Sequence, residues 1–156
     1  MSTHIVASFE ELEKIVGIEL GPTEYIDVDQ ERINKFAEAT GDYQWIHVDV
    51  ERAKVESPFK KTIAHGYLTV SLIPAMIDKV LEFQNTEMTV NYEIEKMRFM
   101  QPVLVGSRVR MHAKIVDVKL LRGISKVTSE ISFEIEGEKK PACKGNIIIL
   151  YYFKQD

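Results

Sequence analysis

Asp42 and His47 are the two residues whose types and spacing best suit acid–base chemistry. Asp42 follows Gly41, a residue type that often ends helices, and His47 comes five positions later, so we expect a turn between them. Such a turn can bring a carboxylate and an imidazole into contact with one water molecule. Adding water to a double bond needs two such groups, because one takes a proton and the other gives one. The alternative from spacing alone is that Asp42 bonds local amides and His47 is a packing residue.

Short helices are expected on both sides of this pair. Ser8 followed by Glu11 has the pattern of a capping box, which predicts a helix over 9–16. Asp29 is a good N-cap for a second helix, which Gly41 would end. Two further short elements are expected, a strand over 23–28 and a helix over 50–55.

The longest apolar segment covers residues 66–83 and predicts a long helix that is buried on most of its faces. Pro74 lies inside this segment and is expected to kink the helix. Apolar and polar residues alternate over 108–115 and 127–135, which is typical of strands with one face in water. The sequence therefore predicts an α+β fold in which an antiparallel sheet wraps the helix. The strands expected are 89–99, 108–115, 127–135 and 147–153.

Composition limits the classes of protein that the chain can represent. Its 156 residues suit a single domain over 1–156, and 45% apolar with 28% charged residues is typical of a soluble globular protein. The net charge of −4 argues against a nucleic-acid partner. Cys143 is the only cysteine, so an internal disulfide is impossible. Without a signal peptide or a membrane-length apolar run, a cytoplasmic protein with no membrane partner is expected.

The string Thr-Gly-Asp-Tyr-Gln-Trp-Ile-His over 40–47, together with Ala53, resembles the hydratase-2 motif of the MaoC-like (R)-specific enoyl-CoA hydratases. The string departs from this motif at Gln44 and Trp45, where the motif has Asn-Pro. That variant resembles the branch that includes nodulation protein N. Residues 63–69 resemble the start of the family's central helix, and 91–109 resemble its following strand and turn. The resemblance extends over about residues 10–152.

This resemblance implies a fold, an activity and roles for particular residues. The family has the hot-dog fold, a long central helix wrapped by an antiparallel sheet, and its members are typically dimers or larger. Asp42 and His47 match the catalytic pair that activates water, and the backbone N–H of Gly66 matches the donor to the thioester carbonyl. Ser71 matches a pocket serine, although a helix serine can also bond its own backbone. The implied substrate is an acyl-CoA or acyl-carrier-protein thioester, with no cofactor and no metal.

Two further residues are candidates for the substrate pocket. His65, beside Gly66, can line the pocket or be structural, and Trp45 can form a wall of the acyl pocket or pack against a helix. His112 lies on the polar register of a strand and is expected to be solvated. The spacing of the histidines does not match a metal site.

The resemblance favours hydration of trans-2-enoyl thioesters to (3R)-hydroxyacyl thioesters, or the reverse dehydration. One alternative is a hot-dog acyl-CoA thioesterase, which commonly uses a differently placed carboxylate. Another is a non-catalytic subunit that binds acyl thioesters, because Gln44 and Trp45 alter the turn between the catalytic side chains.

Overall fold

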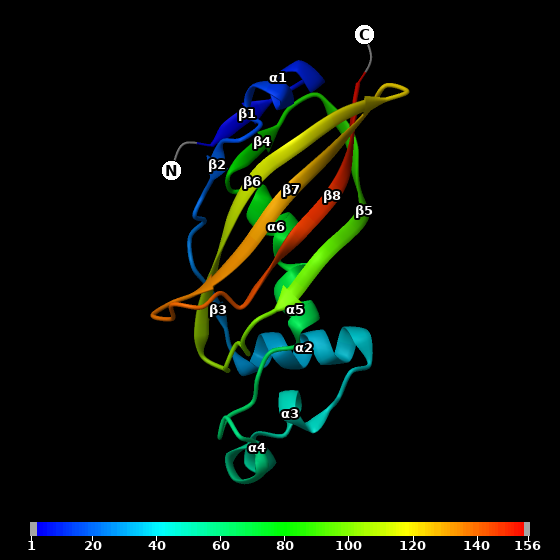
Figure 1. The fold of residues 1–156 in the computed structure, drawn as a ribbon. Coiled ribbons are helices and arrows are strands. Elements are labelled where there is room, and N and C mark those ends of the chain that lie inside the picture. Colours follow the sequence, from blue (N-terminus) through cyan, green and yellow to red (C-terminus); the bar gives the residue numbers. More distant parts are fainter. Residues whose placement is uncertain (1–2, 155–156) are drawn as a thin grey trace.

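A curved antiparallel sheet wraps a central helical segment in the computed structural model, which describes residues 3–154 (Figure 1). The strand order is β2-β6-β7-β8-β5, and β3 pairs with β6. A separate parallel pair, β1 with β4, lies near one end of the sheet. This arrangement confirms the predicted α+β class. The strands are β1 (His4–Val6), β2 (Glu19–Leu20), β3 (Ile26–Val28), β4 (Leu81–Phe83), β5 (Thr86–Phe99), β6 (Ser107–Leu121), β7 (Ile124–Ile135) and β8 (Cys143–Phe153).

The alternating strands form the middle of the sheet. Buried and half-buried side chains alternate along the whole of β7. They alternate in the same way over most of the first half of β6. The buried side of each strand faces the helix, which confirms the period-2 prediction. β5, expected over 89–99, lies at the end of the strand order, where most of its side chains are exposed.

The central helix is shorter than predicted and is divided in two, α5 (Gly66–Ser71) and α6 (Ile73–Ile77). Pro74 has no N–H to donate to a carbonyl four residues earlier, so the regular helical ladder cannot continue through this position. The prediction of a helix reaching residue 83 is wrong at its end. Leu81–Phe83 instead pairs with β1 as a strand.

The short helices begin where the capping residues predict, although α1 ends two residues earlier than predicted. Ser8 caps α1 (Phe9–Lys14), Asp29 caps α2 (Gln30–Thr40), and Asp49 caps α4 (Val50–Glu56) through bonds to backbone N–H groups. The segment between Asp42 and His47 is only partly the expected turn. A one-turn helix, α3 (Trp45–Val48), contains His47, and the turn before it carries Asp42.

The hydrophobic core lies between the sheet and the inner side of α5 and α6. The other side of this helical segment remains exposed at Tyr67, Ser71, Pro74 and Ala75. The prediction that the helix is buried on most of its faces is therefore wrong, because one sheet covers only one side of it. Within residues 3–154, no helix is long and apolar enough to cross a membrane. The largest fully buried side chains are those of Phe133, Leu12, Ile33, Met76, Met111, Ile115 and Ile131.

Candidate active site

Asp42 is placed by the end of α2. Gly41 adopts the left-handed conformation, φ 75°, in which its N–H caps the helix by donating to the carbonyl of Ala37. The chain then turns, and the Gln44 N–H donates to Asp42 Oδ1 at 3.3 Å. The local bond that offers an alternative explanation for Asp42 is thus present. It uses one carboxylate oxygen, and the half-exposed side chain leaves Oδ2 free to face the neighbouring histidines.

His47 is buried, and its ring orientation is fixed from the segment before α5. Its Nδ1 lies 2.7 Å from the carbonyl oxygen of Ile63. A carbonyl oxygen can only accept, so Nδ1 carries the hydrogen and Nε2 carries a free lone pair. Burial lowers the pKa of His47 below 6.5, and the neighbouring His65 lowers it further, while the bond to Ile63 and the charge of Asp42 oppose this shift. His47 is therefore held in the neutral form, which can accept a proton at pH 7.

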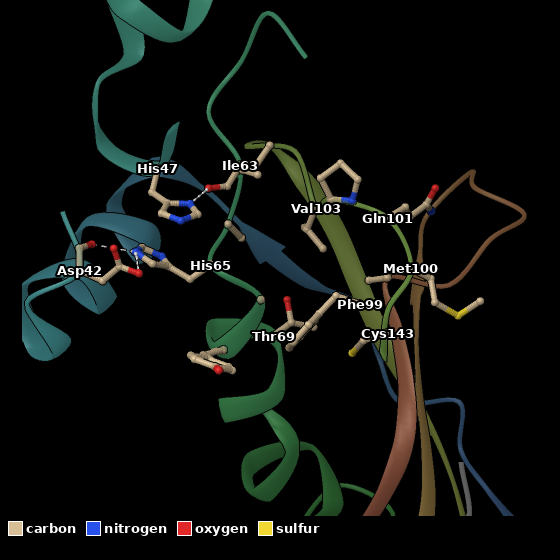
Figure 2. Close-up of a pocket in the computed structure, with 15 residues that line it drawn as sticks. Asp42, His47, Ile63, His65, Thr69, Phe99, Met100, Gln101, Val103 and Cys143 are labelled. Atoms are coloured by element: carbon tan, nitrogen blue, oxygen red, sulfur yellow. Dashed lines mark hydrogen bonds and ion pairs between the residues drawn. The ribbon is translucent and has the colours of Figure 1, made fainter. Parts of the chain in front are cut away.

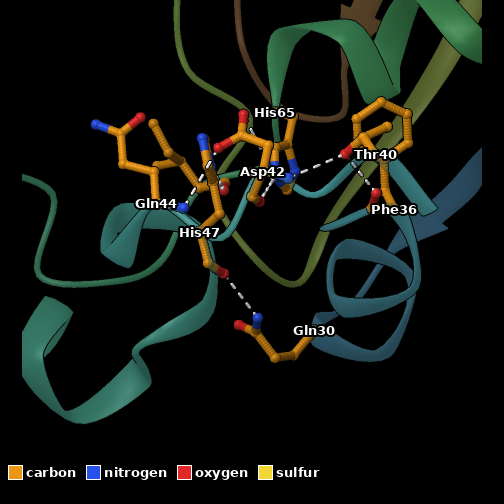
Figure 3. Close-up of polar contacts among 8 residues, drawn as sticks. Gln30, Phe36, Thr40, Asp42, Gln44, His47 and His65 are labelled. Atoms are coloured by element: carbon orange, nitrogen blue, oxygen red, sulfur yellow. Dashed lines mark hydrogen bonds and ion pairs between the residues drawn. The ribbon is translucent and has the colours of Figure 1, made fainter. Parts of the chain in front are cut away.

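The fold brings Asp42, His47 and His65 together. A carboxylate oxygen of Asp42 and one ring nitrogen of each histidine all lie within 4.8 Å of one another (Figures 2 and 3). The departure at Gln44 and Trp45 from the hydratase-2 motif does not separate Asp42 from His47. Two proton acceptors, the Asp42 carboxylate and His47 Nε2, are therefore close enough to hold one water molecule.

These groups open into a pocket of about 500 Å³ between α5 and the ends of β5 and β8 (Figure 2). Asp42, His47, His65 and Gly66 line it, as the sequence predicts.

Ser71, which was also predicted to lie in the substrate pocket, does not line it. It lies two positions after Thr69, a lining residue, and two helical steps turn a side chain by about 200°. The Ser71 hydroxyl donates to the Tyr67 carbonyl, at 2.7 Å, and borders a second pocket.

Trp45 also lies outside the pocket that contains Asp42 and His47. It is half-buried on α3, and the Arg52 guanidinium lies over its ring, 4.4 Å from the centroid. The prediction that Trp45 walls this pocket is therefore wrong in placement, because the one-turn helix points its side chain toward α4. Trp45 instead packs against Arg52 of α4, which agrees with the other interpretation, that this side chain packs against a helix.

Gly66 combines a free N–H with a close aromatic neighbour. It is the first residue of α5, where no intrahelical acceptor exists for its N–H. A Cβ at this position would lie 2.8–3.1 Å from three ring atoms of Phe99. The absence of a side chain therefore lets the Phe99 ring cover the start of the helix. The ring of Tyr67 meets that of Phe99 edge-on, with centroids 6.0 Å apart.

Several pocket residues were not predicted from the sequence. Thr69 carried a usable signal, because it lies four positions after His65 and so shares a helix face with it. Phe99, Gln101 and Cys143 carried none, since β5 and β8 reach the pocket only through sheet pairing. Burial raises the pKa of Cys143 to about 11, so this residue lines the pocket as a thiol and not as a reactive thiolate.

Asp42, His47 and His65 also form a group of three closely spaced residues, within residues 3–154, whose side chains are of types that can bind a metal ion. Spacing along the sequence did not predict this group, because His47 and His65 are far apart in the chain. Two of the four ring nitrogens already bond carbonyl oxygens, Nδ1 of His47 with Ile63 and Nε2 of His65 with Asp42. These bonds leave one nitrogen on each ring for a further contact, and Asp42 also bonds the Gln44 N–H, so the arrangement suits a water molecule better.

Comparisons with known proteins agree with this fold. A model of the MaoC like domain family matches residues 11–135. The chain is 41% identical over 145 residues to 3-hydroxyacyl-thioester dehydratase Z of Mycobacterium tuberculosis, covering 92% of this chain and 95% of that protein. It is 46% identical over 141 residues to nodulation protein N of Rhizobium leguminosarum bv. viciae, covering 88% and 87%.

Solved structures share the architecture at lower sequence identity. The R-hydratase PhaJ1 of Pseudomonas aeruginosa superposes with a TM-score of 0.72 at 24% identity, over 95% of this chain and 87% of that one. A monoamine oxidase regulatory protein from an Archaeoglobus species gives a TM-score of 0.81 at 22% identity, over 99% and 100%. The fold is thus a hot-dog fold with an Asp–His pocket beside the central helix. The chain belongs to the MaoC-like domain family, which confirms the resemblance found in the sequence.

Proposed function

We propose that this protein is a hydro-lyase that acts on acyl thioesters, as an (R)-specific enoyl-CoA hydratase or in reverse as a 3-hydroxyacyl dehydratase. The observation that carries the proposal is the grouping of the Asp42 carboxylate and the His47 ring, within 4.8 Å, in the pocket that Gly66 borders. The relatives named as dehydratases support the same reaction class. No resident cofactor or metal is part of the proposal, and a cytoplasmic location stays an expectation.

In the proposed reaction, one water molecule donates its hydrogens to Asp42 and to Nε2 of His47. Its oxygen attacks C3 of the enoyl group while one proton passes to the Asp–His pair, which delivers a proton to C2. The free N–H of Gly66 stabilises the enolate-like thioester oxygen that forms between these events. The hydroxyl at C3 and the hydrogen at C2 come from one water, so the net reaction is hydration. The family resemblance favours the (3R) product.

Loss of enoyl absorbance, measured beside release of free thiol on trans-2-enoyl-CoA substrates, tests the function. Hydration consumes the conjugated double bond and leaves the thioester intact, so we expect the first signal without the second. Thiol release would identify a thioesterase, and neither signal would identify a binding subunit. Chiral analysis of the product is expected to return the (3R) alcohol, and a (3S) alcohol would contradict the proposed stereochemistry.

Gly66→Ala is expected to lower kcat/KM for hydration by about 10²-fold, the scale of a misplaced reacting group. Gly66 does not have a positive φ, so alanine fits the backbone, and its Cβ pushes the Phe99 ring into the pocket. The double variant Gly66→Ala/Phe99→Ala removes the clash and is expected to recover most of the loss. Equal losses in the single and double variants would show that the contact with Phe99 is not the cause.

We also propose that the protein is a homodimer, assembled through β5 and the exposed side of α5 and α6. Within residues 3–154, β5 pairs with β8 alone, so its other edge presents unpaired backbone groups along 14 residues. Exposed apolar side chains follow the strand at Met88, Val90, Tyr92 and Ile94. A pocket of about 490 Å³ lies between Tyr92 and Ile94 of this strand and the exposed helix residues Ser71 and Pro74. A second copy, related by two-fold symmetry, would pair the two edges and cover both apolar surfaces.

Sedimentation at micromolar concentration is expected to give about twice the 17.9 kDa mass of one chain, or a larger assembly. Ile94→Glu places a charge in the proposed interface and is expected to shift the protein toward monomer. Leu120→Glu is the matched control, because Leu120 is similarly exposed, 52% against 58% for Ile94, and lies in the β6–β7 hairpin. A wild-type protein that sediments only as a monomer would refute the dimer.

A further inference from the structure

His65 contacts both members of the Asp–His pair from a buried position, with 3% of the side chain exposed. Its Nε2–H donates to the backbone carbonyl of Asp42 at 2.9 Å (Figure 3). Its ring stacks on that of His47, with centroids 3.8 Å apart and an interplanar angle of 24°. One side chain therefore connects the segment before α5 to the turn that carries Asp42 and to the helix that carries His47.

The bond from His65 is the shortest contact to the backbone of Asp42 itself, beside the helix cap at Gly41 and the bond from the His47 N–H to the Gln44 carbonyl, 3.0 Å. Between Gly41 and the start of α3, the Asp42 N–H lies 3.4 Å from the Thr40 hydroxyl oxygen, and the Gln44 N–H lies 3.3 Å from Asp42 Oδ1. Both contacts are long and lie on the surface. The bond from His65 is shorter and comes from a buried donor, where a hydrogen bond is stronger than in water. His65 thus supplies the short buried bond to Asp42 that the local contacts of this turn do not provide.

The remaining nitrogen of His65 shows that packing alone does not explain an imidazole here. Nδ1 is buried without a hydrogen-bond partner among the described residues. An unpaired buried polar atom is costly, and a phenyl ring would fill this space between Phe36 and His47 without that cost. The cost is consistent with a residue kept for its other nitrogen, the one that bonds Asp42.

We propose that His65 is a positioning residue, which holds the Asp42 turn against the His47 ring so that the carboxylate and Nε2 of His47 meet on one water. His65 acts through the backbone of Asp42 and through the face of the His47 ring. The kinetic consequence rests on the proposed hydro-lyase function, whereas the structural consequence, a rigid turn, does not.

Two substitutions separate positioning from packing. His65→Phe keeps an aromatic ring against His47 and removes the donor to Asp42, whereas His65→Gln loses the ring and places an amide N–H near the position of Nε2. Positioning predicts that His65→Phe lowers kcat for hydration by about 10²-fold with little change in KM, and that His65→Gln recovers most of this loss. Packing predicts the reverse order, because phenylalanine fills the space better than a buried glutamine.

A second measurement does not depend on activity. Backbone order parameters from NMR relaxation are expected to be near 0.85, the rigid value, at Asp42 and Gln44 in the wild type and in His65→Gln, and to fall in His65→Phe. The melting temperature of His65→Phe is expected to equal or exceed that of the wild type. Should this variant not fold, His65→Met removes the same donor with a more adaptable side chain.

The outcomes decide between the proposals. High activity and an ordered turn in His65→Phe, or a loss in His65→Gln as large as in His65→Phe, would overturn the positioning role. A wild-type protein that hydrates no enoyl thioester would refute the proposed function instead, and the order parameters would still decide whether His65 holds the turn.

Discussion

Asp42→Asn is expected to lower hydration by about 10²–10⁴-fold, the usual loss when one general acid–base group is removed. The substitution changes the chemistry of the site with little change in its shape. An asparagine Oδ1 can still accept from the Gln44 N–H, and the bond from His65 reaches the backbone carbonyl, which the substitution leaves in place. What is lost is Oδ2, which becomes an amide nitrogen that cannot take a proton from water.

Asp49→Asn is the matched control for this experiment. Asp49 also follows a helical segment and also accepts a bond from a backbone N–H, that of Arg52 at 2.9 Å, but it lies outside the pocket. We expect activity near that of the wild type, with a similar circular dichroism spectrum and melting temperature in both variants. If Asp42→Asn retained more than about a tenth of wild-type turnover, outside the expected range, Asp42 would be a turn residue and the proposed site would be wrong.

His47→Asn is expected to cause a loss in the same range, about 10²–10⁴-fold. The asparagine amide nitrogen stands close to the position of Nδ1, so the bond to the Ile63 carbonyl can be kept while the acceptor Nε2 is removed. The double variant Asp42→Asn/His47→Asn should lose little more than the worse single variant, because both groups act on one water molecule. Turnover rates from the enoyl absorbance assay measure all three losses.

His112→Asn is the control for replacing a histidine elsewhere. His112 contacts Glu134, 2.7 Å from Nε2 to the carboxylate, on the face of the sheet away from the pocket. The sequence predicted a solvated residue there, and the structure places it in a half-buried ion-pair cluster with Arg110 and Glu134. We expect normal hydration by this variant.

The double variant Asp42→Asn/His47→Asn also tests whether the two groups share one water molecule. If the losses of the two single variants multiplied in the double variant, Asp42 and His47 would act independently and not on a shared water.

The sequence by itself determined the local features of this protein. Ser8, Asp29 and Asp49 cap helices through bonds to residues three positions away, and such bonds need no other part of the chain. The alternation in β6 and β7 follows from the pleat of a strand. The approach of Asp42 to His47 is also local, because five residues and a helix-ending glycine span it. The family motif was recognisable for the same reason.

The tertiary structure decided which other residues join the pair. His65 meets His47 only because the Ile63 carbonyl binds the His47 ring, and Phe99 meets Gly66 only because β5 pairs with β8 beside the helix. Ser71 faces away from the site, since the helix rotates by about 100° for each residue and the motif does not specify which face is covered. Contacts between distant segments depend on packing and sheet register, and no short-range pattern in the sequence encodes them.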